Sequence, residues 1–211
     1  MQKIAMFGGT FDPIHNGHIG TALYFQKALS LDKIIFIPTN LPPHKEIKSN
    51  TPAEIRMEMC SIAVRDYPFF EVSNLEINRN GCSYTVDTLE ALKDIYQTAE
   101  FYLIVGADMF LTITDWKKSD RIFELATICA VPRNGNNYSV LDQHASELQK
   151  QGVKSVVADV PLVRVSSTMI REKVKNDENI SAFVPQTIQE YIIKNNLYKG
   201  VNPQQWNSIK N

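Results

Sequence analysis

The chain is poor in cysteine, and its few cysteines are not spaced as metal ligands or as a disulfide framework. Among 211 residues there are three, Cys60, Cys82 and Cys129. An odd number at wide spacing, with no C-x-x-C pair, argues against a disulfide scaffold and against a four-sulfur metal site. We therefore expect reduced thiols, most of them buried.

The chain also lacks an excess of charge and a long apolar run. Its 22 Lys and Arg residues balance 23 Asp and Glu residues, for a formal net charge of -1, which is unlike a nucleic-acid-binding domain. No run approaches the ~18 apolar residues of a membrane span. The first apolar segment reaches Gly8 and then Asp12 before it has the length of a signal-peptide core. We expect a cytoplasmic protein that binds neither nucleic acid nor membrane.

Along the chain, segments that resemble β-strands alternate with segments that resemble α-helices. Short runs rich in Ile, Val and Phe alternate with longer stretches of helical periodicity, which is typical of β-α-β units and a parallel sheet. Strands are expected over residues 3–7, 33–37, 69–72, 101–105, 127–131 and 155–158. Helices are expected near residues 17–29, 53–65, 84–96, 117–125, 140–150, 168–175 and 186–195.

Length and apolar content fit one core. Apolar residues make up 44% of the chain, close to the ~45–50% of globular proteins, and the length suits one ordinary domain. We predict an α/β fold, a Rossmann-like parallel β-sheet with helices on both faces. It would form a single domain over residues 1–211, with a small C-terminal helical part at about 166–200.

The stretch MFGGTFDPIHNGHIG, residues 6–20, follows the first predicted strand. Gly8 and Gly9 let a ligand approach the backbone, and a helix is expected to begin near Asn16 or Gly17. Backbone amides and the positive end of that helix would then lie where a phosphate could bind. The stretch matches neither G-x-G-x-x-G nor G-x-x-x-x-G-K-[ST]. The alternative is a tight turn with capping residues, which leaves its two histidines unexplained.

Those histidines, His15 and His18, stand three positions apart, so their rings can face the same side of the helix. Their N–H groups could stabilise charge that develops on phosphoryl oxygens. A structural role for either ring is one alternative. A zinc site is another, but it needs a third ligand, and the remaining histidines are His44 and His144, with no H-E-x-x-H motif.

A second strand-to-helix junction, VSSTMIR, occupies residues 165–171. Hydroxyls and amides at Ser166, Ser167 and Thr168, with Arg171 one turn further on, could form another phosphate-binding site. The alternative is a Ser/Thr cap followed by a surface arginine.

Residues 8–18, GGTFDPIHNGH, resemble the G-G-T-F-D-P-x-H-x-G-H signature of adenylyltransferases in the HxGH nucleotidyltransferase superfamily. Residues 165–171 resemble that superfamily's [IV]-S-S-T-x-[IV]-R motif. Five further segments are similar to bacterial nicotinate-nucleotide adenylyltransferases: PPHK at 42–45, SYTVDT at 83–88, GADM at 106–109, DW at 115–116 and PR at 132–133. The resemblance covers residues 3 to about 199.

The resemblance implies ATP and nicotinate mononucleotide as substrates, deamido-NAD and pyrophosphate as products, and Mg²⁺ bound with ATP. It implies catalytic roles for His15, His18, Lys45 and Arg171. The ATP site would comprise Gly8, Gly9, Thr10, Phe11, His15, His18, Gly106, Asp108, Ser166, Ser167, Thr168 and Arg171. The mononucleotide site would comprise Thr10, Lys45, Thr85, Trp116 and Arg133. No residue is expected to ligate a metal.

Simple chemistry is compatible with these roles. Trp116 interrupts an apolar face beside lysines, so an exposed ring could stack on a heterocycle; a core tryptophan is the alternative. Thr85, in the first turn of a predicted helix, could hold a carboxylate or merely cap. Asp108 follows a strand end and could accept ribose hydroxyls, or cap a helix. Lys45 and Arg133 could meet phosphates or lie solvated.

Four alternatives remain at this stage. Nicotinamide mononucleotide could replace or join the nicotinate form, or the chain could be a pantetheine-phosphate adenylyltransferase. A zinc hydrolase would use His15, His18 and His44. A sensor would bind ATP without releasing pyrophosphate. The sequence also leaves a homo-oligomer open.

Overall fold

The computed structural model describes residues 1–41, 51–79, 81–132, 138–158 and 165–199. Six strands form one sheet, and every neighbouring pair is parallel. In sheet order the strands are β3 (Phe70–Val72), β2 (Lys33–Pro38), β1 (Lys3–Gly9), β4 (Glu100–Gly106), β5 (Ala126–Val131) and β6 (Ser155–Val157). The predicted parallel α/β sheet is confirmed.

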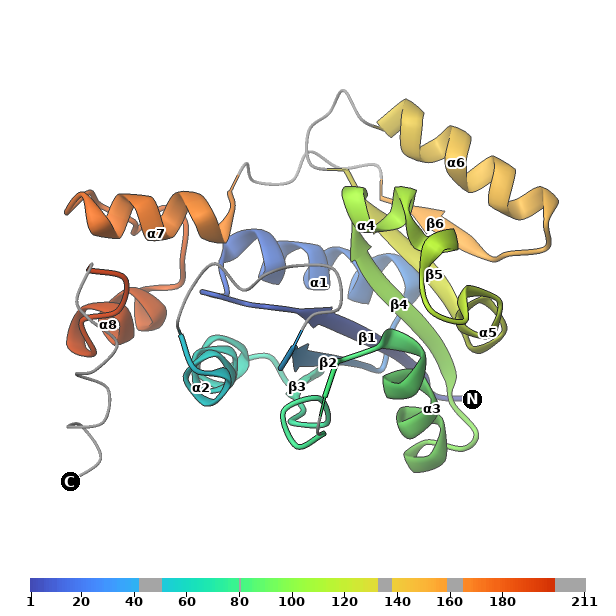
Figure 1. The fold of residues 1–211 in the computed structure, drawn as a ribbon, viewed down its shortest axis with the longest axis horizontal. Helices are drawn as coiled ribbons and strands as arrows, with labels where there is room; N and C mark the ends of the chain where they lie inside the picture. Colours follow the sequence, from blue (N-terminus) through green and yellow to red (C-terminus); the bar gives the residue numbers. More distant parts are fainter. Residues whose placement is uncertain (42–50, 80, 133–137, 159–164, 200–211) are drawn as a thin grey trace.

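Helices flank the sheet on both sides (Figure 1). One face packs against α1 (Asn16–Leu29), α2 (Ala53–Val64), α7 (Ser167–Lys175) and α8 (Gln186–Lys194). The other packs against α3 (Thr85–Ile95), α4 (Ala107–Leu111), α5 (Ser119–Leu125) and α6 (Tyr138–Lys150). The prediction of helices on both faces is confirmed.

Strand β1 shows how this burial follows from the sequence. Ala5 and Phe7 enter the core under α1 and α2, whereas Ile4 and Met6 enter the core under α3 to α6. Successive side chains of a strand point to opposite faces, so a strand covered on both faces is apolar throughout rather than alternating.

The segment between β4 and β5 differs from its prediction. The five-residue α4 and the 3-10 helix η1 (Ile113–Asp115) were not expected, because elements this short carry no periodic signal. The helix predicted from residue 117 begins at Ser119, because Lys118 has a left-handed φ of 53° that interrupts the chain's helical path.

The strand order reverses between β1 and β4. From β1 the chain proceeds outward through β2 and β3, and from β4 it proceeds the other way through β5 and β6. Parallel α/β sheets bind ligands at the carboxyl ends of the strands where the order reverses. Here those ends are Gly9 and Gly106.

All three cysteines are free, with Cys60 and Cys129 buried and Cys82 exposed, so the prediction of reduced, mostly buried thiols is confirmed. Among the described residues, no helix is both long enough and apolar enough to cross a bilayer.

Candidate active site

Two histidines form the start of α1. His15 is the N-cap residue, and its Nδ1 accepts a hydrogen bond from the His18 amide (3.3 Å). In return the His18 Nδ1 accepts one from the His15 amide (3.2 Å). The rings stack with centroids 3.6 Å apart and planes 14° apart. They face the same side, as predicted, but the reciprocal capping was missed, although imidazoles three apart can act like the Ser and Glu of a capping box.

This capping fixes which ring nitrogen carries the proton. Because Nδ1 accepts in each neutral ring, Nε2 carries the hydrogen and donates. Burial lowers the pKa of His15 from 6.5 to about 4. Burial, and then the neighbouring His15, lower the pKa of His18 well below 6.5. At neutral pH the pair therefore offers two uncharged Nε2–H donors.

That arrangement disfavours the zinc alternative. A zinc-binding imidazole nitrogen must be unprotonated, whereas in His15 and His18 the unprotonated nitrogen already accepts a backbone hydrogen bond. His44 lies outside the described residues. Within the described ranges, no three His, Cys, Asp or Glu side chains gather where they could hold a metal ion.

The neutral state of His15 makes folding stability pH-dependent. Between pH 6.5 and about 4 the unfolded chain binds more protons, so the free energy of unfolding falls as the pH drops. At about 1.4 kcal/mol per pKa unit, the loss approaches about 3 kcal/mol by pH 4. We expect His15→Asn, which keeps a capping oxygen, to weaken this dependence in urea unfolding at pH 7, 5.5 and 4. Identical pH slopes in the two proteins would contradict the assignment.

The strained residue of the signature loop is Phe11 rather than a glycine. Its φ is 50°, a conformation uncommon for residues with a side chain. Gly9 matters for packing, because a Cβ there would lie 3.0 Å from the Phe11 ring. That ring is buried and meets the His18 ring edge-on, with centroids 4.9 Å apart. A place for Phe11 at the ATP site stays a prediction; what the structure shows is that its ring packs against that of His18.

Gly17 joins the two sequence motifs. A Cβ on Gly17 would lie 2.8 Å from Val165 Cγ1 and 3.1 Å from His15 Nδ1. The first of these distances is one that real Cβ atoms essentially never show. Position 17 must therefore be glycine-sized for the second motif to approach the first.

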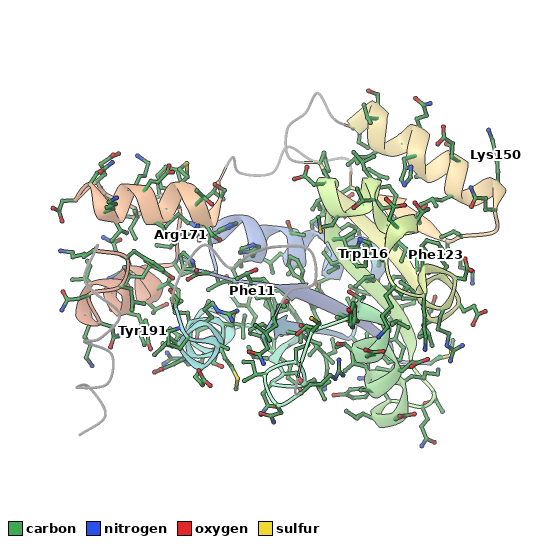
Figure 2. All side chains as sticks on the ribbon, viewed as in Figure 1. Phe11, Trp116, Phe123, Lys150, Arg171 and Tyr191 are labelled. Atoms are coloured by element: carbon green, nitrogen blue, oxygen red, sulfur yellow. The ribbon has the colours of Figure 1, made fainter. Side chains whose placement is uncertain are left out.

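Hydrogen bonds complete this junction. Ser167 Oγ donates to the carbonyl of Pro13 (2.9 Å), and Arg171 Nη1 donates to the carbonyl of Asp12 (2.7 Å). The structure thus brings together segments 154 and 159 residues apart in the chain. In the view of Figure 2, Phe11 lies between Arg171 on one side and Trp116 on the other.

The other hydroxyls of the second motif have local partners. Ser166 is the N-cap of α7, and its Oγ accepts from the Met169 amide (3.2 Å). Thr168 Oγ1 accepts from Arg171 Nη2 (3.2 Å). Ser166 does cap the helix, as the alternative predicted, and phosphate contacts by Ser166, Ser167, Thr168 and Arg171 remain predictions.

Two of the residues predicted to bind the mononucleotide, Thr85 and Trp116, lie on adjacent elements. Thr85 is the first residue of α3, and Trp116 follows η1. Lys117 Nζ lies 3.9 Å from the ring centroid of Tyr84 and 3.5 Å from Asp87 Oδ2, which holds the two elements together. Trp116 is half-buried and packs against the core. The prediction that its ring is exposed is therefore wrong, although part of the side chain remains accessible to solvent.

The remaining predicted residues fall into two groups. Gly106 ends β4, and Asp108 lies exposed in the first turn of α4, at the same sheet edge as Gly9. Lys45 and Arg133 lie outside the described residues, so their roles stay predictions.

The sequence prediction missed Arg56 of α2. Its side chain is 1% exposed, and Nη1 donates to the carbonyl of Thr10 (2.6 Å). The available signal was spacing, because Arg56, Met59, Cys60 and Ala63 recur at the i, i+3, i+4, i+7 positions of a buried helix face. A buried arginine requires hydrogen-bond acceptors within the core, so its position on this face indicates a structural role.

Comparisons with known proteins identify the family of the chain. The model of the cytidylyltransferase-like family matches residues 6–173. A probable nicotinate-nucleotide adenylyltransferase of Clostridium botulinum is 42% identical, covering 94% of this chain and 99% of its own. One from Oceanobacillus iheyensis is 37% identical, covering 94% and 97%.

A solved structure also shares the fold. The Plasmodium falciparum nicotinic acid mononucleotide adenylyltransferase complexed with NaAD superposes with a TM-score of 0.76, at 19% identity, covering 94% of this chain and 98% of that one. Given the family match and the full-length relatives, the chain belongs to the cytidylyltransferase-like family, among its bacterial nicotinate-nucleotide adenylyltransferases.

Proposed function

We propose that the protein transfers the adenylyl group of ATP to nicotinate mononucleotide. A phosphate oxygen of the mononucleotide attacks the α-phosphorus of ATP, the bond to the β-phosphate oxygen breaks, and deamido-NAD and pyrophosphate leave. The observation that carries this proposal is the junction of the two motifs, where Arg171 donates to the Asp12 carbonyl in the loop that leads from β1 to the His15–His18 pair. Full-length relatives bearing this activity in their names support it.

The reaction needs little acid–base chemistry from the protein. A phosphate monoester has a second pKa near 6 and is largely dianionic at neutral pH, so the nucleophile is already ionised. The tasks that remain are to align two anions and to stabilise charge on the transferring phosphoryl group. Neutral Nε2–H donors on His15 and His18 suit the second task, and their lowered pKa values suit a donor better than a base.

The triphosphate is proposed to enter as its Mg²⁺ complex. Among the described residues, no group of three carboxylates or imidazoles could hold the ion, which fits a cation carried by phosphate oxygens and water. We assign His15 and His18 to the α-phosphate. The β,γ side is assigned to Ser167, Thr168 and Arg171, and Lys45 to the incoming phosphate or the triphosphate.

The acceptor is proposed to lie between α3 and the segment after η1. Trp116 would stack on the pyridine ring, and Thr85 at the start of α3 would hold its carboxylate. Arg133 would meet the acceptor phosphate. Asp108 and Gly106 at the end of β4 would receive the ATP ribose.

Pyrophosphate release tests the function. ATP and Mg²⁺ are incubated with nicotinate mononucleotide, nicotinamide mononucleotide or pantetheine phosphate in parallel, with EDTA as a control. We expect release with the nicotinate form, at least about tenfold faster than with either other acceptor, and none with EDTA. A preference for another acceptor overturns the substrate assignment, and ATP binding without release supports the sensor.

A further inference from the structure

A buried cluster behind the signature loop has no role in the function described above. It consists of Asp12 from that loop, Arg56 from α2 and Tyr198 from the segment after α8. Asp12 is 3% exposed and Arg56 is 1% exposed. The Tyr198 hydroxyl donates to Asp12 Oδ1 at 2.7 Å. Burial, and then the nearby Asp12, raise the pKa of Tyr198 well above 10, so the hydroxyl remains a donor.

Arg56 of this cluster and Arg171 of α7 hold the strained turn at Phe11 from both sides. The carbonyl before Phe11, that of Thr10, accepts from Arg56 Nη1 at 2.6 Å. On the other side, the carbonyl of Asp12, the residue that follows Phe11, accepts a hydrogen bond from Arg171 Nη1 at 2.7 Å. A left-handed φ of 50° is unfavourable for a residue with a side chain. Such a conformation persists where surrounding contacts over-determine it.

Arg56 connects this turn to two other segments. Nη2 donates to the carbonyl of Thr39, just after β2 (2.8 Å), and Nε donates to the carbonyl of Thr51, just before α2 (3.3 Å). A guanidinium is suited to this task because its five N–H donors are fixed in one plane. Asp12 supplies the nearest compensating charge, since its attraction opposes the lowering of the Arg56 pKa by burial.

The turn is coupled to the catalytic pair by direct packing. The Phe11 ring meets the His18 ring edge-on at 4.9 Å, and the His18 ring stacks on that of His15 at 3.6 Å. A change in the backbone at Phe11 therefore moves the surface on which both imidazoles rest. Arg56 and Tyr198 act on the rings through this path, and they do not need to touch the substrate.

We propose that Tyr198, Asp12 and Arg56 are positioning residues for adenylyl transfer, which hold the Phe11 turn so that His18 and His15 meet the α-phosphate. This inference rests on the proposed function. It assigns the segment after α8 a part in setting the geometry of the two histidines, which lie within the first 20 residues.

The test compares two Tyr→Phe variants. Tyr198→Phe removes the hydrogen bond to Asp12. Tyr191→Phe is the matched control, because the Tyr191 hydroxyl of α8 also donates to a carboxylate, Glu58 Oε2 at 2.6 Å, which belongs to helix packing. With both substrates saturating, we expect kcat to fall about tenfold or more in Tyr198→Phe, since small misplacements of catalytic groups are costly. KM values should change less than about threefold, and Tyr191→Phe should keep the wild-type kcat.

Two further measurements separate the possible outcomes. Rates are expressed per ATP-binding site counted by calorimetry, so loss of folded protein does not appear as loss of kcat. The ring NMR signals of His15 and His18 are recorded without substrate, and should shift in Tyr198→Phe and not in Tyr191→Phe. Arg56→Lys keeps the positive charge but loses the planar set of N–H donors. It should lower kcat more than Tyr198→Phe does.

The results that overturn each idea are distinct. If wild-type protein releases no pyrophosphate, the proposed function fails, while the NMR comparison still tests the positioning. If the wild type is active and Tyr198→Phe keeps kcat within about twofold, with unshifted histidine signals, the positioning role is wrong. Equal losses of kcat in Tyr198→Phe and Tyr191→Phe likewise reject it in favour of a general effect on the C-terminal helices.

Discussion

Replacing His18 by asparagine is expected to lower kcat by about 10²–10³-fold, the loss typical of removing one donor that stabilises transition-state charge. Asparagine keeps a side-chain oxygen near the position of Nδ1, so it can still accept from the His15 amide and preserve the helix start. It places no donor where Nε2 lies. Single-turnover pyrophosphate release measures the effect, because it isolates the chemical step from product release.

His18→Gln provides the matched comparison. The amide nitrogen of glutamine extends to about the position of Nε2. Glutamine is less suited than asparagine to accept the hydrogen bond from the His15 amide, because it has no acceptor near the position of Nδ1. We expect glutamine to recover part of the rate and to be less stable than asparagine, by about 0.5–2 kcal/mol for a lost N-terminal hydrogen bond. A rate within about threefold of wild type in His18→Asn would remove His18 from the catalytic groups.

Replacing Gly17 by alanine is expected to lower both stability and kcat, because the added methyl group disturbs the packing between the two motifs. The added Cβ would lie 2.8 Å from Val165 Cγ1 and 3.1 Å from His15 Nδ1, so the two motifs must separate. Overpacking of this kind costs about 1–3 kcal/mol of stability. The separation also moves His15, so kcat should fall by more than about tenfold. Urea unfolding and pyrophosphate release measure the two effects.

Gly20 offers a control one turn further along the same helix. A Cβ on Gly20 meets nothing within 4 Å, so Gly20→Ala should stabilise α1 by about 0.5–1 kcal/mol with unchanged kcat. If Gly17→Ala behaves like Gly20→Ala, the contact between Gly17 and Val165 does not limit the approach of the motifs.

Much of the fold could be predicted because its signals are local. Strands such as β1 and β5 are apolar on both faces, which indicates a sheet covered by helices on each side. The two strand-to-helix junctions were visible as unusual runs of Gly, His, Ser and Thr. Helix α4 and the 3-10 helix η1 escaped prediction because they are set by tertiary packing of buried residues such as Phe110 and Ile113.

The two motifs that the fold brings together could be predicted from the sequence, but their geometry could not. The sequence placed His15 and His18 on one side of a helix, but it does not show that Nδ1 of each is occupied by the backbone. Nor does it show that the strained residue is Phe11, because a left-handed φ there depends on Arg56 and Arg171 from distant segments. Contacts across more than 40 residues leave no trace in local spacing.

The reciprocal capping of α1 has an evolutionary consequence. The same two imidazoles cap the start of the helix and are proposed to face the reacting phosphate. A substitution that alters the chemistry at either position then also alters where the helix begins. Selection for a new reaction cannot vary these two properties independently. If the proposed sites are correct, substrates on this scaffold diversify more easily on the proposed acceptor side, around α3 and η1, than at the helix proposed to hold the triphosphate.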